Sequence, residues 1–262
     1  MKRWTKAISG TTVAVALALG GTMGPASAAT SRYSVSESGI KDGNPSSVDN
    51  GWYREDTRPG GSVSVTRHLT SASDGFSGPA GFGDGALAIT TNNSNYAKAQ
   101  VMNHSLQGKS LSTVTALDYW TFQSSETGSV NDAASLQLRV DVDGDLTTTA
   151  DQTNLVYEPY WNDTEGTDPQ SALAPDVWQH WEATGGDWWS SKQITCGAFS
   201  LAPGAGGPPF SRPSAVAEAC PTAKVVAFGV NAGSYNRNYV VAVDGLHIST
   251  TTDDFTYDFG PK

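Results

Sequence analysis

The stretch Leu136-Gln137-Leu138-Arg139-Val140-Asp141-Val142-Asp143 decides the fold class. Apolar and polar residues alternate strictly along it, which is the period of a β-strand with one face in a core and the other facing water. The pairs Asp84-Gly85, Asp143-Gly144 and Asp244-Gly245 are turn signals between such strands. Seven further stretches follow the same logic and are expected to be strands: 85–91, 117–124, 154–160, 177–184, 225–231, 239–244 and 255–259.

Helical periodicity is nearly absent. The nearest candidate is the short segment Ser214–Ala219, which is flanked by Pro213 and Pro221. About eight strands in one chain of this length favour a single all-β domain, an antiparallel β-sandwich, over residues 61–262, with the last strand returning to pair near the first. Residues 29–60 are rich in Ser, Gly, Asp and Asn, and are expected to be a lead-in that is either mobile or folded over the sandwich.

The first 28 residues have the pattern of a secretory signal peptide. Three basic residues precede a short apolar stretch at 12–19, and Ala26-Ser27-Ala28 provides a cleavage site. That apolar stretch is too short to span a bilayer. Removal of the three basic residues would leave 13 basic against 26 acidic residues, a net charge of −13. Such a chain repels nucleic acid and anionic membranes, so the protein is expected to be secreted, extracellular and without either partner.

Composition excludes further classes. The 262 residues are 38% hydrophobic, 16% charged and 10% aromatic. A disordered acidic chain would have fewer aromatic residues, and a helical chain rich in Lys and Glu would have more charge. The oligomeric state does not follow from the sequence.

The two cysteines of the chain are Cys196 and Cys220. An even pair in an exported protein is most simply a disulfide, and here it would close a loop rich in Pro and Gly. The chain-entropy model assigns such a bond about 3 kcal/mol. A catalytic thiol is the alternative, but no constellation of His and Asn marks one.

Seven segments of the chain form a recognisable set: Gly81 to Thr91, Leu117 to Trp120, Leu136 to Asp145, Leu155 to Trp161, Trp178 to Trp181, Gly186 to Trp189 and Tyr239 to Leu246. Through these segments, which span most of the mature chain, the sequence resembles a group of secreted bacterial jelly-roll modules, mostly of unassigned function. In architecture these modules are similar to carbohydrate-binding modules and lectin-like sandwiches. The resemblance implies a jelly roll, but it carries over no activity and no ligand-binding residue.

Tryptophans are concentrated between residues 161 and 189. Indole faces stack on sugar rings, so a polysaccharide is the expected ligand class. The alternative is that the tryptophans fill the core. Alternation predicts that Trp178 and Trp181 face opposite sides, and that Trp188 and Trp189 cannot both point inward. The stacking candidates are Trp178, Trp181, Trp188 and Trp189, with Asn162, Asp163 and Asp187 as polar partners for sugar hydroxyls.

An acidic turn follows the first strand quoted above. Asp141, Asp143 and Asp145 are spaced two apart around Gly144 and are followed by Thr147 and later Asp151. The turn thus gathers several of the hard oxygen ligands that calcium prefers. The turn is not an EF-hand, because Leu146 and Gln152 stand where Gly and Glu are required. The sequence therefore predicts either a structural calcium site or a solvated Asp-Gly turn.

Two glutamates occur on expected strands, Glu158 and Glu182. If both face one cleft they can form the carboxylate pair of a glycoside hydrolase, with His180 as a further catalytic candidate. The alternative is a structural role for each. The histidines are scattered without the spacing of a zinc site, so calcium is the metal that the sequence favours.

Three functions remain open from the sequence. The first is non-catalytic recognition of an extracellular or cell-wall polysaccharide. The second is a polysaccharide-degrading enzyme, a hydrolase or lyase with a carboxylate pair. The third is a structural or inhibitor-like protein that presents the loop between Cys196 and Cys220 to a protein partner.

Overall fold

The computed structural model describes residues 30–43, 51–69, 77–126, 132–162 and 173–260. The predicted signal peptide, residues 1–28, lies outside the described residues, as does Asp163. The described part is mostly β-strand, with one α-helix, α1 (Pro213–Ala219), at the place where the sequence has its nearest helical candidate. Short 3₁₀ turns occur at Glu37–Gly39, Leu111–Thr113 and Pro159–Trp161.

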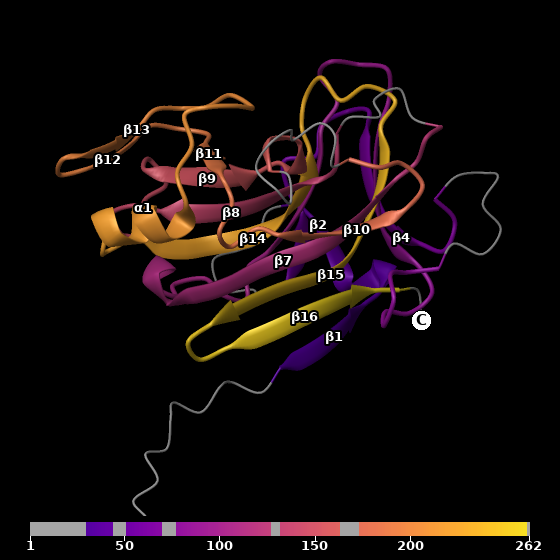
Figure 1. Ribbon diagram of the computed structural model, residues 1–262, viewed down its shortest axis with the longest axis horizontal. Helices are drawn as coiled ribbons and strands as arrows, with labels where there is room; N and C mark the ends of the chain where they lie inside the picture. Colours follow the sequence, from indigo (N-terminus) through magenta and orange to yellow (C-terminus); the bar gives the residue numbers. More distant parts are fainter. Residues whose placement is uncertain (1–29, 44–50, 70–76, 127–131, 163–172, 261–262) are drawn as a thin grey trace, which may run out of the picture.

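The first sheet has seven strands (Figure 1). The long strand β15 runs through its middle, paired with β7 on one side and with β5 and then β16 on the other. β10 extends the sheet beyond β7, and β1 and β4 extend it beyond β16 and β5. Its strands are β1 (Ser31–Val35), β4 (Gly61–Thr66), β5 (Ala86–Thr91), β7 (Val114–Gln123), β10 (Trp178–Glu182), β15 (Val240–Thr250) and β16 (Asp254–Phe259).

The second sheet also has seven strands, in the order β11-β9-β8-β14-β6-β3-β2. All its neighbours are antiparallel except β2 and β3. Its strands are β2 (Ile40–Asp42), β3 (Trp52–Arg54), β6 (Ala99–Asn103), β8 (Ser135–Asp141), β9 (Gln152–Tyr157), β11 (Trp188–Ser190) and β14 (Lys224–Ala232). A separate hairpin is formed by β12 (Ile194–Cys196) and β13 (Phe199–Leu201).

One core lies between the two sheets, as expected for an all-β sandwich. In β8 the alternation holds: Leu136, Leu138 and Val140 are fully buried in this core. The opposite face of β8 is expected to be exposed to solvent, but Gln137 and Asp141 on that face are also buried. Other structure therefore covers the outer face of the second sheet, and the functional site is found there.

The segment expected to be a lead-in contributes strands to both sheets. β1 pairs in parallel with β16, so the last strand of the chain pairs with a strand from the expected lead-in. β2 and β3 form the edge of the second sheet. The eight predicted strands are all present, although Asp244-Gly245 lies inside β15 rather than in a turn. The register between β15 and β7 shifts at this point, and Gly245 has a φ of +56°, so the pair forms a bulge.

Cys196 and Cys220 form the predicted disulfide, with a Cα–Cα distance of 5.5 Å. The bond joins the end of β12 to Cys220, the residue after α1, so the loop that it closes contains β13 and the whole helix. Within the described residues, no helix is both long and apolar enough to cross a membrane.

Candidate functional site

A cleft of about 520 Å³ lies on the outer face of the second sheet. Its floor is set by the register of three strands, β14, β8 and β9. Asn231 of β14 is paired with Ser135 of β8, and in the next row Gln137 of β8 is paired with Val156 of β9. Because their neighbours along each strand fill the core, these side chains all point outward. The sheet therefore presents a mostly polar surface to the cleft.

Aromatic side chains stand around this floor. Trp189 of β11 is paired with Val156 and is the outward member of the Trp188-Trp189 pair. Tyr160 and Tyr235 also line the cleft. Tyr235 is 76% exposed and has a φ of +77°, a left-handed conformation that is rare for residues other than Gly. Strained, exposed residues of this kind gather at binding sites.

Glu158 is one of two acidic residues of the cleft. It lies there because the outward alternation of β9 continues through Asn154 and Val156 to it. Burial raises its pKa to about 7, and the negative charge of Asp132, which also lines the cleft, adds to the effect. The nearby indoles of Trp189 and Trp161 act in the opposite direction. The Glu158 side chain is thus half protonated near neutral pH, which is the condition for a general acid or for a neutral hydrogen-bond donor.

Two buried polar atoms of cleft residues have no hydrogen-bond partner among the described residues. They are Nε1 of Trp189, a donor, and Oε1 of Gln137, an acceptor. The Trp189 indole lies near the Glu158 carboxyl group but not in hydrogen-bond geometry. A buried polar group without a partner costs free energy, so both atoms are suited to a ligand that donates and accepts.

A buried ionic network supports one end of the floor. Glu55 accepts hydrogen bonds from Arg139, at 3.0 Å, and pairs with His104, also at 3.0 Å. Burial by itself would raise the pKa of Glu55, but these partners outweigh it and hold the pKa below its usual value. Arg139 also donates to Asn154 at 3.1 Å. The network fixes Asn154, which lines both the main cleft and an adjoining hollow of about 230 Å³.

The four tryptophans proposed as stacking candidates separate into different environments. Trp181 and Trp188 are in the core, where their indoles donate to Thr121 and to the carbonyl oxygen of Ala183. Trp178 is half-buried on the outer face of the first sheet and donates to the carbonyl oxygen of Ser77. Trp189 alone of the four lines the cleft.

The polar candidates near Trp189 are engaged with the chain itself. The Asn162 amide donates to the carbonyl oxygens of Glu158 and Asp187 and accepts from the Asp187 backbone N–H. These hydrogen bonds hold the residues after β9 against those before β11. The Asp187 side chain itself is exposed. Asn162 therefore positions the cleft wall that contains Glu158.

The acidic turn gathers a slightly different set of carboxylates from the one expected. Oxygen atoms of Asp141, Asp143 and Asp151 lie within 4.8 Å of one another. Asp145 instead accepts hydrogen bonds from the backbone and hydroxyl groups of Thr147, at 3.1 and 2.6 Å. Asp141 is fully buried, and its Oδ1 has no partner within the described parts of the chain. The turn has the oxygen donors for a hard cation, with Asp151 joining the set.

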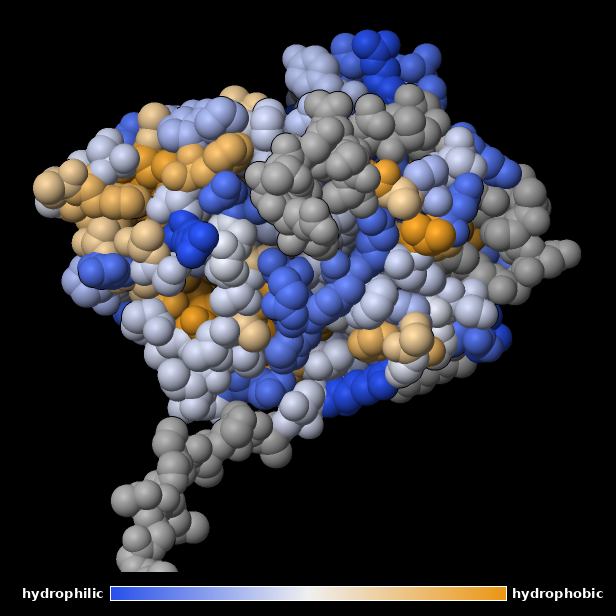
Figure 2. All heavy atoms as spheres, viewed as in Figure 1, coloured by the Kyte–Doolittle hydropathy of each residue, from blue (hydrophilic) through white to orange (hydrophobic). Residues whose placement is uncertain are grey.

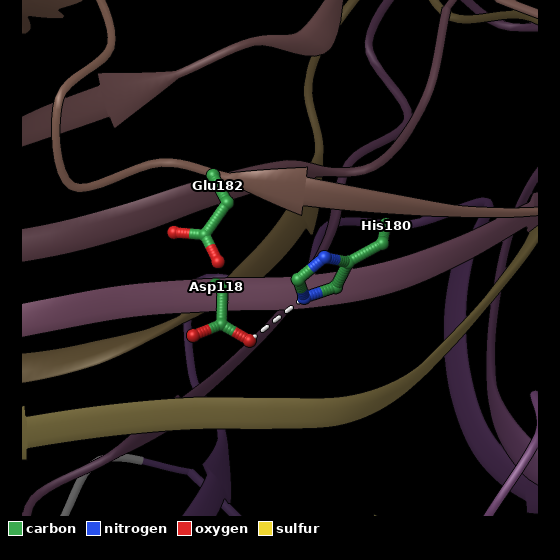
Figure 3. Close-up of side chains that lie close together, drawn as sticks. All are labelled: Asp118, His180 and Glu182. Carbon is green, nitrogen blue, oxygen red and sulfur yellow. Dashed lines mark hydrogen bonds and ion pairs between the residues drawn. The ribbon is translucent and has the colours of Figure 1, made fainter. Parts of the chain in front are cut away.

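Glu182 and His180 are not among the residues that line this cleft, and they lie on the outer face of the first sheet. They project from β10 toward Asp118 of β7 (Figure 3). Figure 2 shows hydrophilic residues in a band across the middle of this face. The Asp118 carboxylate pairs with His180 at 2.9 Å and with His247 at 2.6 Å. Glu158 and Glu182 therefore do not face one cleft.

Sequence reasoning found Glu158 and Trp189 but missed most of the cleft. The alternation in residues 136–143 predicts that Gln137 faces away from the core, but it does not predict that other parts of the chain cover this side chain. Tyr235 follows Gly233-Ser234 in a loop, where only its exposed aromatic character gave a signal. Residues at the cleft that were not singled out are Arg58, Lys98, Asp132, Ser135, Gln137, Asn154, Tyr160, Asn231, Tyr235 and Asn236.

No protein-family model matches the chain, and no curated protein does. The chemistry of the cleft is therefore interpreted from its own residues.

Proposed function

We propose that this protein binds a polysaccharide chain in the cleft on the outer face of the second sheet. The observation that carries the proposal is the pairing of a buried, unpartnered donor on Trp189 with a buried, unpartnered acceptor on Gln137 in one cleft. A sugar hydroxyl both donates and accepts, so a saccharide can satisfy both atoms.

The surroundings of these two atoms favour the same ligand class. Tyr160, Trp189 and Tyr235 offer aromatic faces for the C–H faces of sugar rings, and Asn154, Asn231 and Asn236 offer amides. The adjoining hollow shares Asn154 and Ser191 with the main cleft, so the binding surface extends past a single sugar. A chain of several residues fits this shape better than a monosaccharide.

The proposal includes the architecture and the place of action. Consecutive strands pass repeatedly from one sheet to the other, as β5, β6, β7 and β8 do, which supports a jelly-roll type of sandwich. The predicted signal peptide and the Cys196–Cys220 disulfide support secretion. In an acidic extracellular protein, polysaccharide is the polymer that the aromatic cleft suits.

Calcium binding at the turn after β8 is part of the proposal. Asp141, Asp143 and Asp151 would supply hard oxygen ligands, and a cation would partner the buried Oδ1 of Asp141. Burial and the two neighbouring carboxylates raise the pKa of Asp141, a cost that a bound cation removes. We expect calcium to raise the melting temperature and a chelator to lower it. Asp151→Asn should abolish this response, whereas the exposed Asp187→Asn should keep it.

The experiment that tests polysaccharide binding is depletion of the purified protein from solution by cellulose, chitin, xylan and peptidoglycan. Soluble fragments of the polymer that binds are then titrated by calorimetry. We expect selective binding to one polymer, weakened by Trp189→Phe, which removes the indole N–H but keeps an aromatic ring. Trp178→Phe, on the other sheet, is the matched control and should bind normally. Failure to bind any polymer or fragment would refute the proposal.

One observation favours hydrolysis as a second candidate function: Glu158, with its pKa raised to about 7, lines the cleft together with a second carboxylate, Asp132. In this reading Glu158 protonates the leaving oxygen and Asp132 acts as base or nucleophile. Incubation with the bound polysaccharide would release new reducing ends, and Glu158→Gln would stop the release while binding persists. Binding with no new reducing ends leaves recognition as the function.

A further inference from the structure

The outer face of the first sheet carries a second cluster of functional side chains, unrelated to the cleft. Asp118 of β7 stands directly opposite Glu182 of β10 on one side and opposite His247 of β15 on the other. His180 is two residues from Glu182 on the same face of β10. The register of three strands thus gathers two carboxylates and two imidazoles from distant parts of the chain.

Two carboxylates of this cluster face each other across neighbouring strands. Like charges directly opposite each other destabilise a sheet, and Asp118 and Glu182 are such a pair. Among the described residues, no Lys or Arg forms an ion pair with either carboxylate. His180 and His247 are the partners of Asp118, and both nitrogen and oxygen donors converge on the space between β7 and β10 (Figure 3).

One distance in the cluster matches that between two ligands of one metal ion, and Glu182 lies close to both. The ligand atoms of Asp118, His180 and Glu182 all lie within 4.8 Å of one another, and Oδ1 of Asp118 is 2.9 Å from Nε2 of His180. Two ligand atoms bound at about 2.0–2.2 Å with angles of 90–110° lie roughly 2.9–3.5 Å apart. An ion between them would replace the proton on Nε2, and the neutral imidazole would carry its proton on Nδ1.

The surroundings hold these ligands in place. His247 contacts Oδ2 of Asp118 through Nδ1 at 2.6 Å, and its Nε2 contacts Asp254 at 3.0 Å. The ring of Trp120 lies 4.8 Å from that of His180 at an angle of 36°. Metal ligands are commonly oriented by such an outer layer of carboxylate, imidazole and aromatic groups. These contacts therefore hold the Asp118 carboxylate in place, whereas the exposed Glu182 side chain can rotate to bind an ion.

We propose that Asp118, His180 and Glu182 bind one zinc ion, with His247 and Asp254 orienting Asp118. One imidazole and two carboxylates suit zinc, whereas calcium and magnesium take oxygen ligands. Three protein ligands leave a fourth position, which faces solvent because Glu182 is exposed and the His180 side chain is 34% exposed. Water or an anionic ligand would take that position.

The test is equilibrium dialysis and calorimetry with zinc on protein that carries no polyhistidine tag. We expect one zinc ion per chain in the presence of excess calcium, which keeps the acidic turn after β8 occupied. Affinity should fall by more than about 100-fold in His180→Gln and in Glu182→Gln, and by about tenfold or more in His247→Gln, because direct ligands contribute more than their supports. Cobalt in place of zinc should give the visible absorption of a four-coordinate site.

Matched controls separate this site from unspecific binding. His68→Gln and Glu218→Gln change exposed residues of the same types elsewhere and should bind zinc normally. Because Glu182 is exposed, Glu182→Gln should leave folding unchanged, and its melting temperature without metal checks this. The proposal is overturned if the protein binds no zinc at submillimolar concentration, or if the double variant H180Q/E182Q binds as tightly as the unmodified chain.

Discussion

Glu158 and Glu182 lie on opposite outer faces of the β-sandwich, with the core between them. Glu158 follows β9 of the second sheet and lines the cleft, whereas Glu182 ends β10 of the first sheet and stands opposite Asp118. Any pairwise chemistry of Glu158 must therefore use Asp132, which lines the same cleft. The two faces carry separate sites, and variants on one face are natural controls for the other.

Tyr235 should contribute to polysaccharide binding without contributing much to stability. It is 76% exposed at the cleft, so truncation removes a stacking surface while leaving the core intact. We expect Tyr235→Ala to weaken binding by about 1 kcal/mol, or fivefold to tenfold, with little change in melting temperature. Titration calorimetry and thermal unfolding measure the two quantities.

Tyr33→Ala is the matched control, because Tyr33 is an exposed tyrosine at 47% on β1 of the first sheet. Binding should be normal in this variant. Equal affinity of Tyr235→Ala and the unmodified protein would show that the strained tyrosine does not touch the ligand.

Binding should also depend on pH through Glu158. A ligand that covers the cleft removes more water from this carboxyl group, which further disfavours its ionised form. Since burial has already raised its pKa to about 7, binding should tighten as the pH falls from 8.5 to 5.5. Glu158→Gln, which stays neutral, should bind with an affinity that varies much less over this range. A pH dependence that is the same in both proteins would assign the effect to other groups.

The fold was largely predictable because strand period is a local property. The alternation in Leu136–Asp143 gave β8 and its core face, and the two cysteines gave the disulfide. Short strands such as β2 and β3 were not predicted, because three residues are too few to show an alternation of apolar and polar residues. Alternation predicts which side chains share a face of a strand, but it does not predict which sheet the strand joins.

The candidate sites depend on that missing information. Asp118, His180 and His247 belong to three strands, and only their long-range register brings them to one point. The same limit explains why Glu158 and Glu182 were considered together. The pair Trp188-Trp189 could be interpreted locally, because adjacent residues in a strand point to opposite sides. Trp188 is in the core and Trp189 lines the cleft.

Replacing Trp188 and replacing Trp189 should consequently have different effects on stability and on polysaccharide binding. Trp188 is fully buried and donates to the carbonyl oxygen of Ala183, so Trp188→Ala should destabilise the protein by roughly 3–5 kcal/mol. Trp189→Ala should cost roughly 1–2 kcal/mol, because the side chain is only half-buried, and should weaken polysaccharide binding. Urea unfolding of each variant beside calorimetric titration distinguishes them. Similar losses of stability in the two variants would contradict this division of roles.

Asp244 should make stability fall as the pH rises. This residue of β15 is fully buried; its Oδ1 accepts hydrogen bonds from the backbone N–H groups of Gly245 and Phe259, but its Oδ2 has no partner among the described residues. Burial raises its pKa to about 7, and the charge of Asp258 adds to the effect.

The sign follows from which state holds the proton. Between the unfolded pKa of 3.8 and the folded value of about 7, the folded protein keeps a proton on Asp244 that the unfolded chain has lost. The contribution of Asp244 to stability is therefore highest below pH 4 and declines up to pH 7, by on the order of 4 kcal/mol. Asp244→Asn has the shape of the protonated acid and lacks this decline. Comparing urea unfolding of the two proteins from pH 4 to pH 8 removes the contributions of all other groups, and the unmodified protein should lose stability relative to the variant as the pH rises. A stability difference that stays constant over this range would show that Asp244 remains ionised in the folded protein.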